Sequence, residues 1–232
     1  MISLFVPCYN EEKRLEHNIL KIYAAFLEFH TPFELIIVDD GSIDTTGKIA
    51  KNLIKKYNEI HYQYFNNGPS RRENLAKAFR TAHGDIIVFM DLDLSVDLSY
   101  LPILLESIKT YDIAIGSRYK GKHAQRTFFR RVVSIFYNLF MRFYFGSNIE
   151  DHQCGFKAFK TEKLFLLLNK LGYDSTFKRG WFWDAELLFY AQKSGYSINE
   201  FPVGWHEGKQ STFDLKRELK MLPYILRLRW RL

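Results

Sequence analysis

The sequence of 232 residues has only two cysteines, Cys8 and Cys154, and no long run of uncharged apolar residues. Two isolated cysteines form neither a disulfide framework nor a zinc-binding pattern, so we expect two small buried thiols in a reducing compartment. A membrane-spanning helix needs roughly 18 consecutive apolar residues. The longest candidate, 132–141, is closed by Arg131 and Arg142. The chain is therefore expected not to cross a membrane by itself.

We expect no signal peptide at the start of the sequence, and we find no internal repeat and no low-complexity linker in it. Its start, MISLFVPCYNEE, has no basic region and only a short apolar run, which argues against a secretory leader. Hydrophobic residues make up 47% and aromatic residues 17%, which favours one globular domain over disorder. The formal net charge of +7 fits an anionic partner, such as a nucleotide, a phosphorylated lipid, a membrane or a nucleic acid, and equally a solvated surface.

Short apolar runs alternate with segments of helical periodicity. The runs at 2–6, 35–38, 86–90 and 112–115 predict strands. Between the first two runs, apolar residues recur at helical spacing, as in Leu15, Ile19, Ile22 and Phe26. This order predicts an α/β fold with a mostly parallel, Rossmann-like sheet and helices on both faces.

Polar residues follow each predicted strand, in the sequences PCYNEE, DDGS, DLD and GSR. Ligands bind at the carboxyl ends of the strands in such sheets, so a functional site is expected at one edge. In FMDLDLS, Asp91 and Asp93 lie two residues apart and face the same side if the chain is extended. Two neighbouring carboxylates repel each other unless a cation lies between them. The alternative interpretation is a polar turn, in which Asp is common.

Read in order, VPCYNEE, VDDGSIDTT, DLD and GSR resemble motifs of the inverting glycosyltransferases with the GT-A fold. DHQCGFKAF, GWFWDAELL and EFPVGWHE extend the resemblance to the dolichyl-phosphate (polyprenyl-phosphate) glucose and mannose synthases, and more closely to the β-glucosyltransferase branch. The resemblance implies a GT-A domain over 1–213, and this domain includes a helix at 124–145 that is expected to lie at the membrane interface. A basic amphipathic helix at 214–232 is expected to follow.

The resemblance implies transfer of a hexose from a nucleotide-sugar to a polyprenyl or dolichyl phosphate with inversion, with UDP-glucose favoured over GDP-mannose. Mg²⁺ or Mn²⁺ is the implied cofactor. Donor and cofactor binding is implied for Pro7, Tyr9, Glu11, Val38, Asp40, Asp91, Leu92 and Asp93. The implied metal ligands are Asp91, Asp93 and Ser95. Tyr9 either stacks on the base or fills a core position, whereas Asp39 and Ser42 are expected to shape the turn.

The acceptor implied by the resemblance is a lipid phosphate, which is already ionised near neutral pH and needs positioning and charge compensation more than a base. The implied catalytic residues are Asp151, Arg118 and Asp93, and the implied phosphate-binding residues are Arg118, Arg130, Arg131, His206 and Lys209. Asp151 matches an acid that either orients or deprotonates the acceptor. Asp184 and Glu186 lie on a predicted helix, where each is a candidate partner of an arginine.

Two segments depart from the pattern of the resembling proteins. These usually carry glycine and lysine where this chain has NGPSRR at 67–72, and they often have Ser-Lys where Ser211 is followed by Thr212. The first departure concerns the loop expected to bind the nucleotide phosphates, and the second concerns the loop expected to fold over the product or the lipid phosphate. Neither departure affects Asp91 or Asp93.

Residues 126–145 combine arginines with more large apolar side chains than a half-exposed helix needs. Together with the basic run at 214–232, they predict peripheral binding to an anionic membrane surface, on the cytoplasmic face. The alternative is that one or both helices complete the core or a homodimer interface.

Other functions fit parts of the sequence. Transfer to a glycan or protein hydroxyl would require a general base, for which Asp151 and Asp184 are candidates. A phosphatase of the haloacid dehalogenase type also uses a strand followed by DxD, but normally after its first strand. A non-enzymatic membrane or nucleic-acid adaptor on a transferase scaffold is disfavoured, because Asp40, Asp91, Asp93 and Arg118 are intact. The resemblance implies no nucleic-acid partner.

Overall fold

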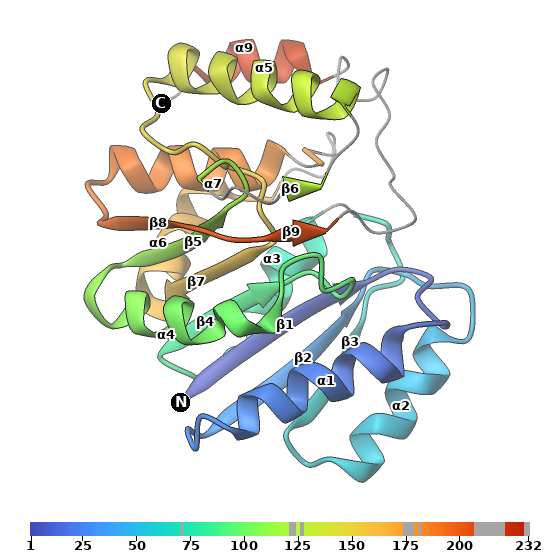
Figure 1. Ribbon diagram of the computed structural model, residues 1–232. Coiled ribbons are helices and arrows are strands. Elements are labelled where there is room, and N and C mark those ends of the chain that lie inside the picture. The colour runs from blue at the N-terminus through green and yellow to red at the C-terminus, as the bar shows by residue number, and fades with distance from the viewer. Residues whose placement is uncertain are drawn as a thin grey trace.

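The computed structural model describes residues 1–70, 72–120, 124–125, 128–173, 179–180, 182–206 and 221–229. For 124–125 and 128–134 it describes only the course of the backbone. These residues form a seven-stranded sheet in the order β3-β2-β1-β4-β7-β5-β8, together with a small β6-β9 sheet (Figure 1).

The strands are β1 (Ile2–Cys8), β2 (Phe33–Asp39), β3 (Ile60–Tyr64), β4 (Ile86–Met90), β5 (Ile113–Ser117), β6 (Ala124–Gln125), β7 (Phe156–Lys160), β8 (Ile198–Pro202) and β9 (Trp205–His206). All four predicted strands are present. The sheet is mostly parallel, as predicted, except that β7 runs antiparallel between β4 and β5. The start of β7 therefore lies at the same edge as the ends of β4 and β5.

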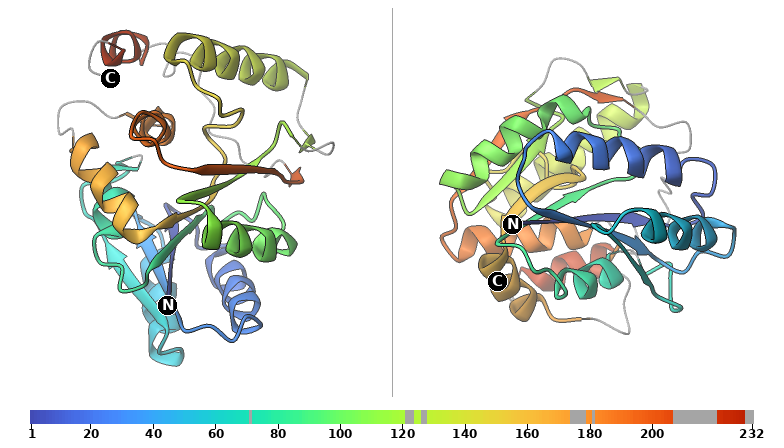
Figure 2. Two further views of the ribbon diagram at one scale, coloured as in Figure 1. Left: turned by 90° about the vertical axis from the view of Figure 1, so that its left-hand side faces the viewer. Right: turned by 90° about the horizontal axis from the view of Figure 1, so that it is seen from below.

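The helices are α1 (Leu15–Leu27), α2 (Thr46–Lys56), α3 (Glu73–Phe79), α4 (Leu101–Thr110), α5 (Phe128–Phe145), α6 (Thr161–Leu171), α7 (Phe182–Lys193) and α9 (Leu222–Leu228), with a 3₁₀ turn η1 (Leu98–Tyr100) before α4. Side chains alternate along β1, so Leu4 and Val6 pack toward α1, α2 and α4, whereas Phe5 packs toward α3, α6 and α7. Helices thus cover both faces of the sheet (Figure 2). The predicted apolar stripe of α1 is buried in the first of these cores.

Helices α5 and α9 form a further layer on the outer side of α7 (Figures 1 and 2). Met141 and Phe145 of α5 are buried against α7, and Ile225 and Leu228 of α9 join the same apolar cluster. Within the C-terminal helix predicted at 214–232, the structure describes α9. Residues 214–220 and 230–232 lie outside the described residues. Among the helices described, none has the length and apolar character required to cross a bilayer.

Candidate active site

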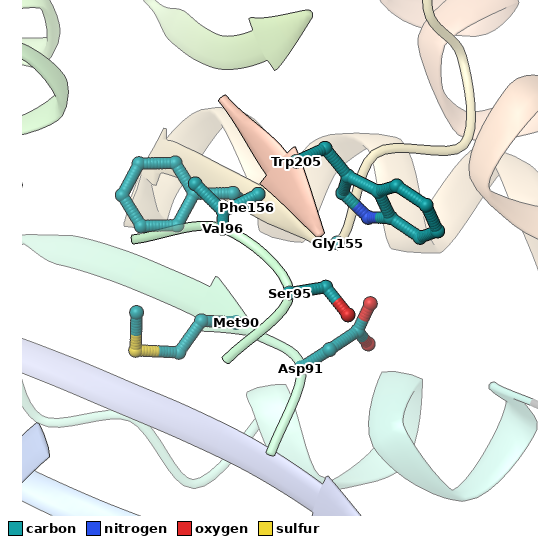
Figure 3. Close-up of a pocket in the computed structure, with 7 residues that line it drawn as sticks. All are labelled: Met90, Asp91, Ser95, Val96, Gly155, Phe156 and Trp205. Atoms are coloured by element: carbon teal, nitrogen blue, oxygen red, sulfur yellow. The ribbon is translucent and has the colours of Figure 1, made fainter. Parts of the chain in front are cut away.

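The acid pair lies in a tight turn that follows β4. The backbone N–H of Asp91 donates to the carbonyl of Gly155 at 3.0 Å, and the Asp93 carboxylate accepts from the backbone N–H of Ser95 at 3.0 Å. The Ser95 carbonyl accepts from the N–H of His206 at 2.9 Å, so β9 (Trp205–His206) lies against the turn. Figure 3 shows the side chains of Asp91 and Ser95 directed toward each other in a small pocket, with Trp205 opposite. Asp93 is exposed.

Gly155 allows the Asp91 carboxylate to lie directly against the chain before β7. A Cβ at this position would lie 1.8 Å from Asp91 Oδ2, well inside any possible contact. The glycine of the CGF motif therefore leaves room for the acid, which explains physically why a glycine stands there.

Asp91 also belongs to a row of alternating charges. The Arg72 guanidinium lies 3.4 Å from Asp91 Oδ1 and 3.1 Å from Asp184 Oδ2, and the Lys157 ammonium lies 3.0 Å from Asp184 Oδ1. Lys157 and Asp184 are buried. Burial raises the pKa of Asp91, and the Arg72 charge opposes this effect. The prediction that Asp184 is the partner of an arginine is confirmed.

Glu186, the second acid of that helix, is also paired with an arginine. Arg179 lies 3.3 Å from Glu186 and donates to Glu73 at 2.7 Å and 3.0 Å. The Tyr224 hydroxyl of α9 donates to Glu186 at 3.0 Å. This buried network joins α3, α7 and α9, and it confirms the predicted pairing of Glu186.

On the donor side, the loops after β1 and β2 face each other. Tyr9 is exposed at the end of β1, where it is available for stacking, and the N–H of Glu11 donates to Thr46 Oγ1 at 2.7 Å. The Glu11 side chain pairs with Arg14. Asp39 accepts from the Ser42 N–H at 2.8 Å, which confirms its expected role in shaping the turn.

The remaining donor-side candidates have different surroundings. Asp40 accepts from the N–H and the hydroxyl of Ser70, at 2.8 Å and 2.7 Å, and from the Asn74 amide at 2.6 Å. It therefore holds the loop before α3. Pro7 is half-buried in β1. Val38 and Leu92 have core side chains, so only their backbones are available to a nucleotide.

On the acceptor side, Arg118 and Asp151 form a pair. Arg118 Nε and Nη2 each donate to one Asp151 oxygen at 2.6 Å, and the Arg118 backbone N–H donates at 3.0 Å. Asp151 is fully buried, which alone would raise its pKa, but the Arg118 charge and hydrogen bonds hold the pKa below its usual range. The Arg118 guanidinium lies 5.9 Å from the centre of the Trp205 ring, which borders the pocket beside Asp91. This geometry favours an orienting role for Asp151 over proton abstraction.

Residues next to this pair connect it to α5. Asn138 of α5 donates to the Tyr119 hydroxyl at 2.9 Å, and its other amide atom lies 3.1 Å from His152 Nδ1. Ser147 Oγ lies 2.8 Å from His152 Nε2. Burial lowers the pKa of His152 to about 3, so the ring is neutral at physiological pH. The position of α5 is therefore linked to the segments that carry Arg118 and Asp151.

The other predicted phosphate-binding residues are only partly located. Arg130 and Arg131 lie on α5, where only the backbone is described, and Lys209 lies outside the described residues. His206 is exposed on β9. The predicted pair of buried thiols, Cys8 and Cys154, is confirmed.

The residues that sequence reasoning missed are Arg72, Lys157, Arg179 and Ser70. Each interacts across the fold with a segment far away in the chain, so local spacing carries no signal for it. The available signals were the departure at 67–72, which includes Ser70 and Arg72, and the DHQCGFKAF motif, which includes Lys157.

The donor atoms at the acid pair suit a hard divalent cation. Among the described residues, no group of three or more His, Cys, Asp or Glu side chains forms a metal site by itself. Mg²⁺ is commonly held by one or two carboxylates together with substrate phosphates, and Asp91, Asp93 and the Ser95 hydroxyl match that donor set. The residues therefore fit a cation that is shared with a phosphorylated ligand.

Comparison with known families decides the affiliation. The family model described as "Glycosyl transferase family 2" matches residues 3–165. The chain belongs to glycosyl transferase family 2. The match begins in β1 and includes Asp91, Asp93, Arg118 and Asp151.

Several curated proteins resemble this family 2 chain. It is 37% identical to glycosyltransferase AglD of Haloferax volcanii, with 100% of this chain and 37% of that protein covered. It is 30% identical to the human dolichyl-phosphate beta-glucosyltransferase, with 89% of the chain and 67% of that protein covered. It is 29% identical to dolichyl-phosphate beta-glucosyltransferase ALG5A of Trichomonas vaginalis, with 98% and 72% covered. The chain thus spans little more than a third of AglD and about 70% of the other two.

Solved structures confirm the GT-A fold of this family 2 member. Glucosyl-3-phosphoglycerate synthase from Mycobacterium tuberculosis, in complex with phosphoglyceric acid, matches with a TM-score of 0.71 and 19% identity, over 99% of this chain and 79% of that one. The same enzyme with Mn²⁺ and UDP-glucose matches with a TM-score of 0.70 and 19% identity, over 99% and 78%.

Proposed function

We propose that this chain transfers glucose from UDP-glucose to a polyprenyl or dolichyl phosphate, with inversion at the sugar carbon and with Mg²⁺ or Mn²⁺ bound at Asp91 and Asp93. The observation that carries the proposal is the buried Arg118–Asp151 pair, beside the pocket that contains Asp91. This pair presents the fixed positive charge of Arg118 to an incoming acceptor, and the Asp151 carboxylate is not free. The names of the relatives, two of them dolichyl-phosphate beta-glucosyltransferases, support the acceptor and the sugar.

The proposed reaction needs no proton acceptor. A phosphate oxygen of the acceptor attacks the anomeric carbon, and the bond to the UDP oxygen breaks with its electron pair remaining on the diphosphate. A bound divalent cation would stabilise the negative charge of that leaving group. Arg118 binds and orients the acceptor phosphate, and Asp151 holds the guanidinium in place. Transfer to a hydroxyl would need a base. Asp151, one candidate for that base, already accepts hydrogen bonds from Arg118 at both of its oxygens.

A transfer assay tests the proposal. The purified chain is incubated with UDP-glucose, Mn²⁺ and either a short polyprenyl phosphate or the corresponding polyprenol, and the product is identified by mass spectrometry. Because phosphate is the ionised nucleophile and the polyprenol needs a base, we expect at least ~100-fold faster transfer to the phosphate. GDP-mannose is the control donor. Equal transfer to the polyprenol would contradict the proposed acceptor, and preference for GDP-mannose would contradict the proposed donor.

We also propose that α5 and α9 hold the site on a membrane surface, because the lipid tail of the acceptor stays in the bilayer. Phe136 and Phe143 are 69% and 92% exposed on α5, and Leu139, Phe140, Leu222 and Leu226 are also exposed. Arg142 and Arg227 are exposed on the same two helices, where anionic headgroups attract them. The Tyr144 hydroxyl donates to the Leu226 carbonyl at 3.2 Å, which joins the two helices. The position that we propose is peripheral, on the cytoplasmic face.

Liposome flotation tests the membrane proposal. Replacing Phe136, Phe140 and Phe143 with Ser is expected to lower binding to anionic vesicles at least ~10-fold, because three exposed aromatic side chains no longer insert. A matched control replaces Leu27, Ile103 and Leu166, which are exposed on α1, α4 and α6, with Ser. The control should bind as the unmodified protein does, with binding that weakens as salt rises. Equal binding by both triple variants would exclude α5 as the membrane contact.

A further inference from the structure

Arg72 contacts the acid pair from a segment that the resemblance does not explain. Its guanidinium lies between Asp91 and Asp184, at 3.4 Å and 3.1 Å, and 4.6 Å from the centre of the Phe89 ring. The side chain is only 10% exposed. Asp91 directly follows β4 and Asp184 lies in the first turn of α7, so the fold brings two distant acids to this one cation.

The backbone at Arg72 adopts a conformation that arginine rarely takes. Its φ of 89° lies in the left-handed region, where a side chain with a Cβ is disfavoured by roughly 1–2 kcal/mol and glycine is not. A strained non-glycine residue at a site suggests that its side chain has a use there.

The charges in the row Asp91–Arg72–Asp184–Lys157 cancel, because two carboxylates face two cations. Asp93 is then the acid that gives this corner its negative charge. A divalent cation that binds without a nucleotide therefore binds to a site with only a weak negative charge. A nucleotide diphosphate adds further negative charge and oxygen ligands, and it offers Arg72 an anion to bind.

We propose that Arg72 is a built-in cation of the donor site, which weakens the binding of a free divalent metal ion and strengthens the binding of the nucleotide diphosphate. This inference rests on the proposed function. Arg72 thereby makes metal binding depend on the donor: metal and diphosphate enter together, and the metal leaves when the diphosphate does. Asp184 and Lys157 position the guanidinium for this role.

The test is calorimetry with Mn²⁺ alone and then with UDP at saturating Mn²⁺. Arg72→Gln removes one positive charge beside Asp91, so we expect about tenfold tighter binding of free Mn²⁺ and about tenfold weaker binding of UDP. Asp184→Asn breaks the same ion pair but removes a negative charge, so it should weaken free Mn²⁺ binding. The two variants therefore shift the Mn²⁺ affinity in opposite directions.

Two further variants serve as controls. Arg72→Lys keeps the charge and should leave free Mn²⁺ binding within about threefold of the unmodified protein. Arg80→Gln removes an arginine that instead contacts Asn169 and Phe165, and it should change neither affinity.

Opposite shifts of the Mn²⁺ affinity support the inference. A purely structural role for Arg72 would weaken Mn²⁺ binding in both Arg72→Gln and Asp184→Asn, and that result would overturn the inference while unmodified protein still binds UDP with Mn²⁺. Failure of the unmodified protein to bind UDP in the presence of Mn²⁺ would instead overturn the proposed function. If Arg72→Gln does not fold, Asp184→Asn and Arg72→Lys still decide: tighter Mn²⁺ binding by Asp184→Asn contradicts the inference.

Discussion

Replacing Asp91 or Asp93 with Asn is expected to lower glucosyl transfer at least ~100-fold, since stabilisation of the leaving diphosphate by a metal contributes several kcal/mol. The fold should survive both changes. The Asp91 side chain is 38% exposed and Arg72 keeps Asp184 as its second partner, so neutral Asn should change the melting temperature little. Asp93 is exposed, where substitutions usually alter stability by no more than about 0.5 kcal/mol.

The measurement compares initial rates and thermal unfolding for each variant, and repeats the unmodified protein in EDTA. Asp97→Asn is the matched control, because Asp97 is an exposed acid in the same loop whose carboxylate caps η1 through the Ser99 N–H at 2.8 Å. Asn caps helices as well as Asp does, so Asp97→Asn should keep full activity. Full activity in EDTA, or in Asp91→Asn, would rule out a metal bound by this acid pair.

Replacing Arg118 with Ala is expected to raise the KM for the lipid phosphate at least ~30-fold, because a charge-assisted contact to the acceptor is lost. Removing one partner of a buried ion pair also costs roughly 3–5 kcal/mol of stability, because Asp151 remains charged and unpaired. Arg118→Lys should restore part of both losses, since it keeps the charge without the two-pronged contact.

Asp151→Asn separates an orienting role from a proton-accepting one. If Asp151 positions Arg118, the KM for the acceptor should rise while the affinity for UDP, measured by calorimetry, stays within about threefold. If Asp151 were a base, kcat would fall at unchanged acceptor KM. Lys120→Ala is the control: Lys120 is a nearby exposed cation, 3.4 Å from Glu200, and should change neither value. An equal loss of UDP affinity in Arg118→Lys would place this arginine on the nucleotide instead of the acceptor.

Local patterns in the sequence predict the sheet and its functional edge. The strands at β1, β2, β4 and β5 follow from short apolar runs, because side-chain alternation and burial act on neighbouring residues. The polar segments after these strands lie at one edge because the strands are parallel, which the helical spacing between the runs implies. The acid pair and the family were within reach of the sequence, and Asp184 and Glu186 were candidate partners of an arginine that the sequence did not identify.

The tertiary structure alone decided which charges meet. Asp91 lies 19 residues from Arg72, and Asp184 lies 112 residues from it, so no spacing rule connects the three. The direction of β7 was equally hidden, since a short apolar segment pairs with its neighbours in either direction. Because β7 runs antiparallel to β4 and β5, Gly155 lies against Asp91, and Asp151 contacts Arg118 directly after β5. Ion pairs and strand direction depend on packing between distant segments, whereas the identity of the acid pair and its strand depends only on neighbours in the chain.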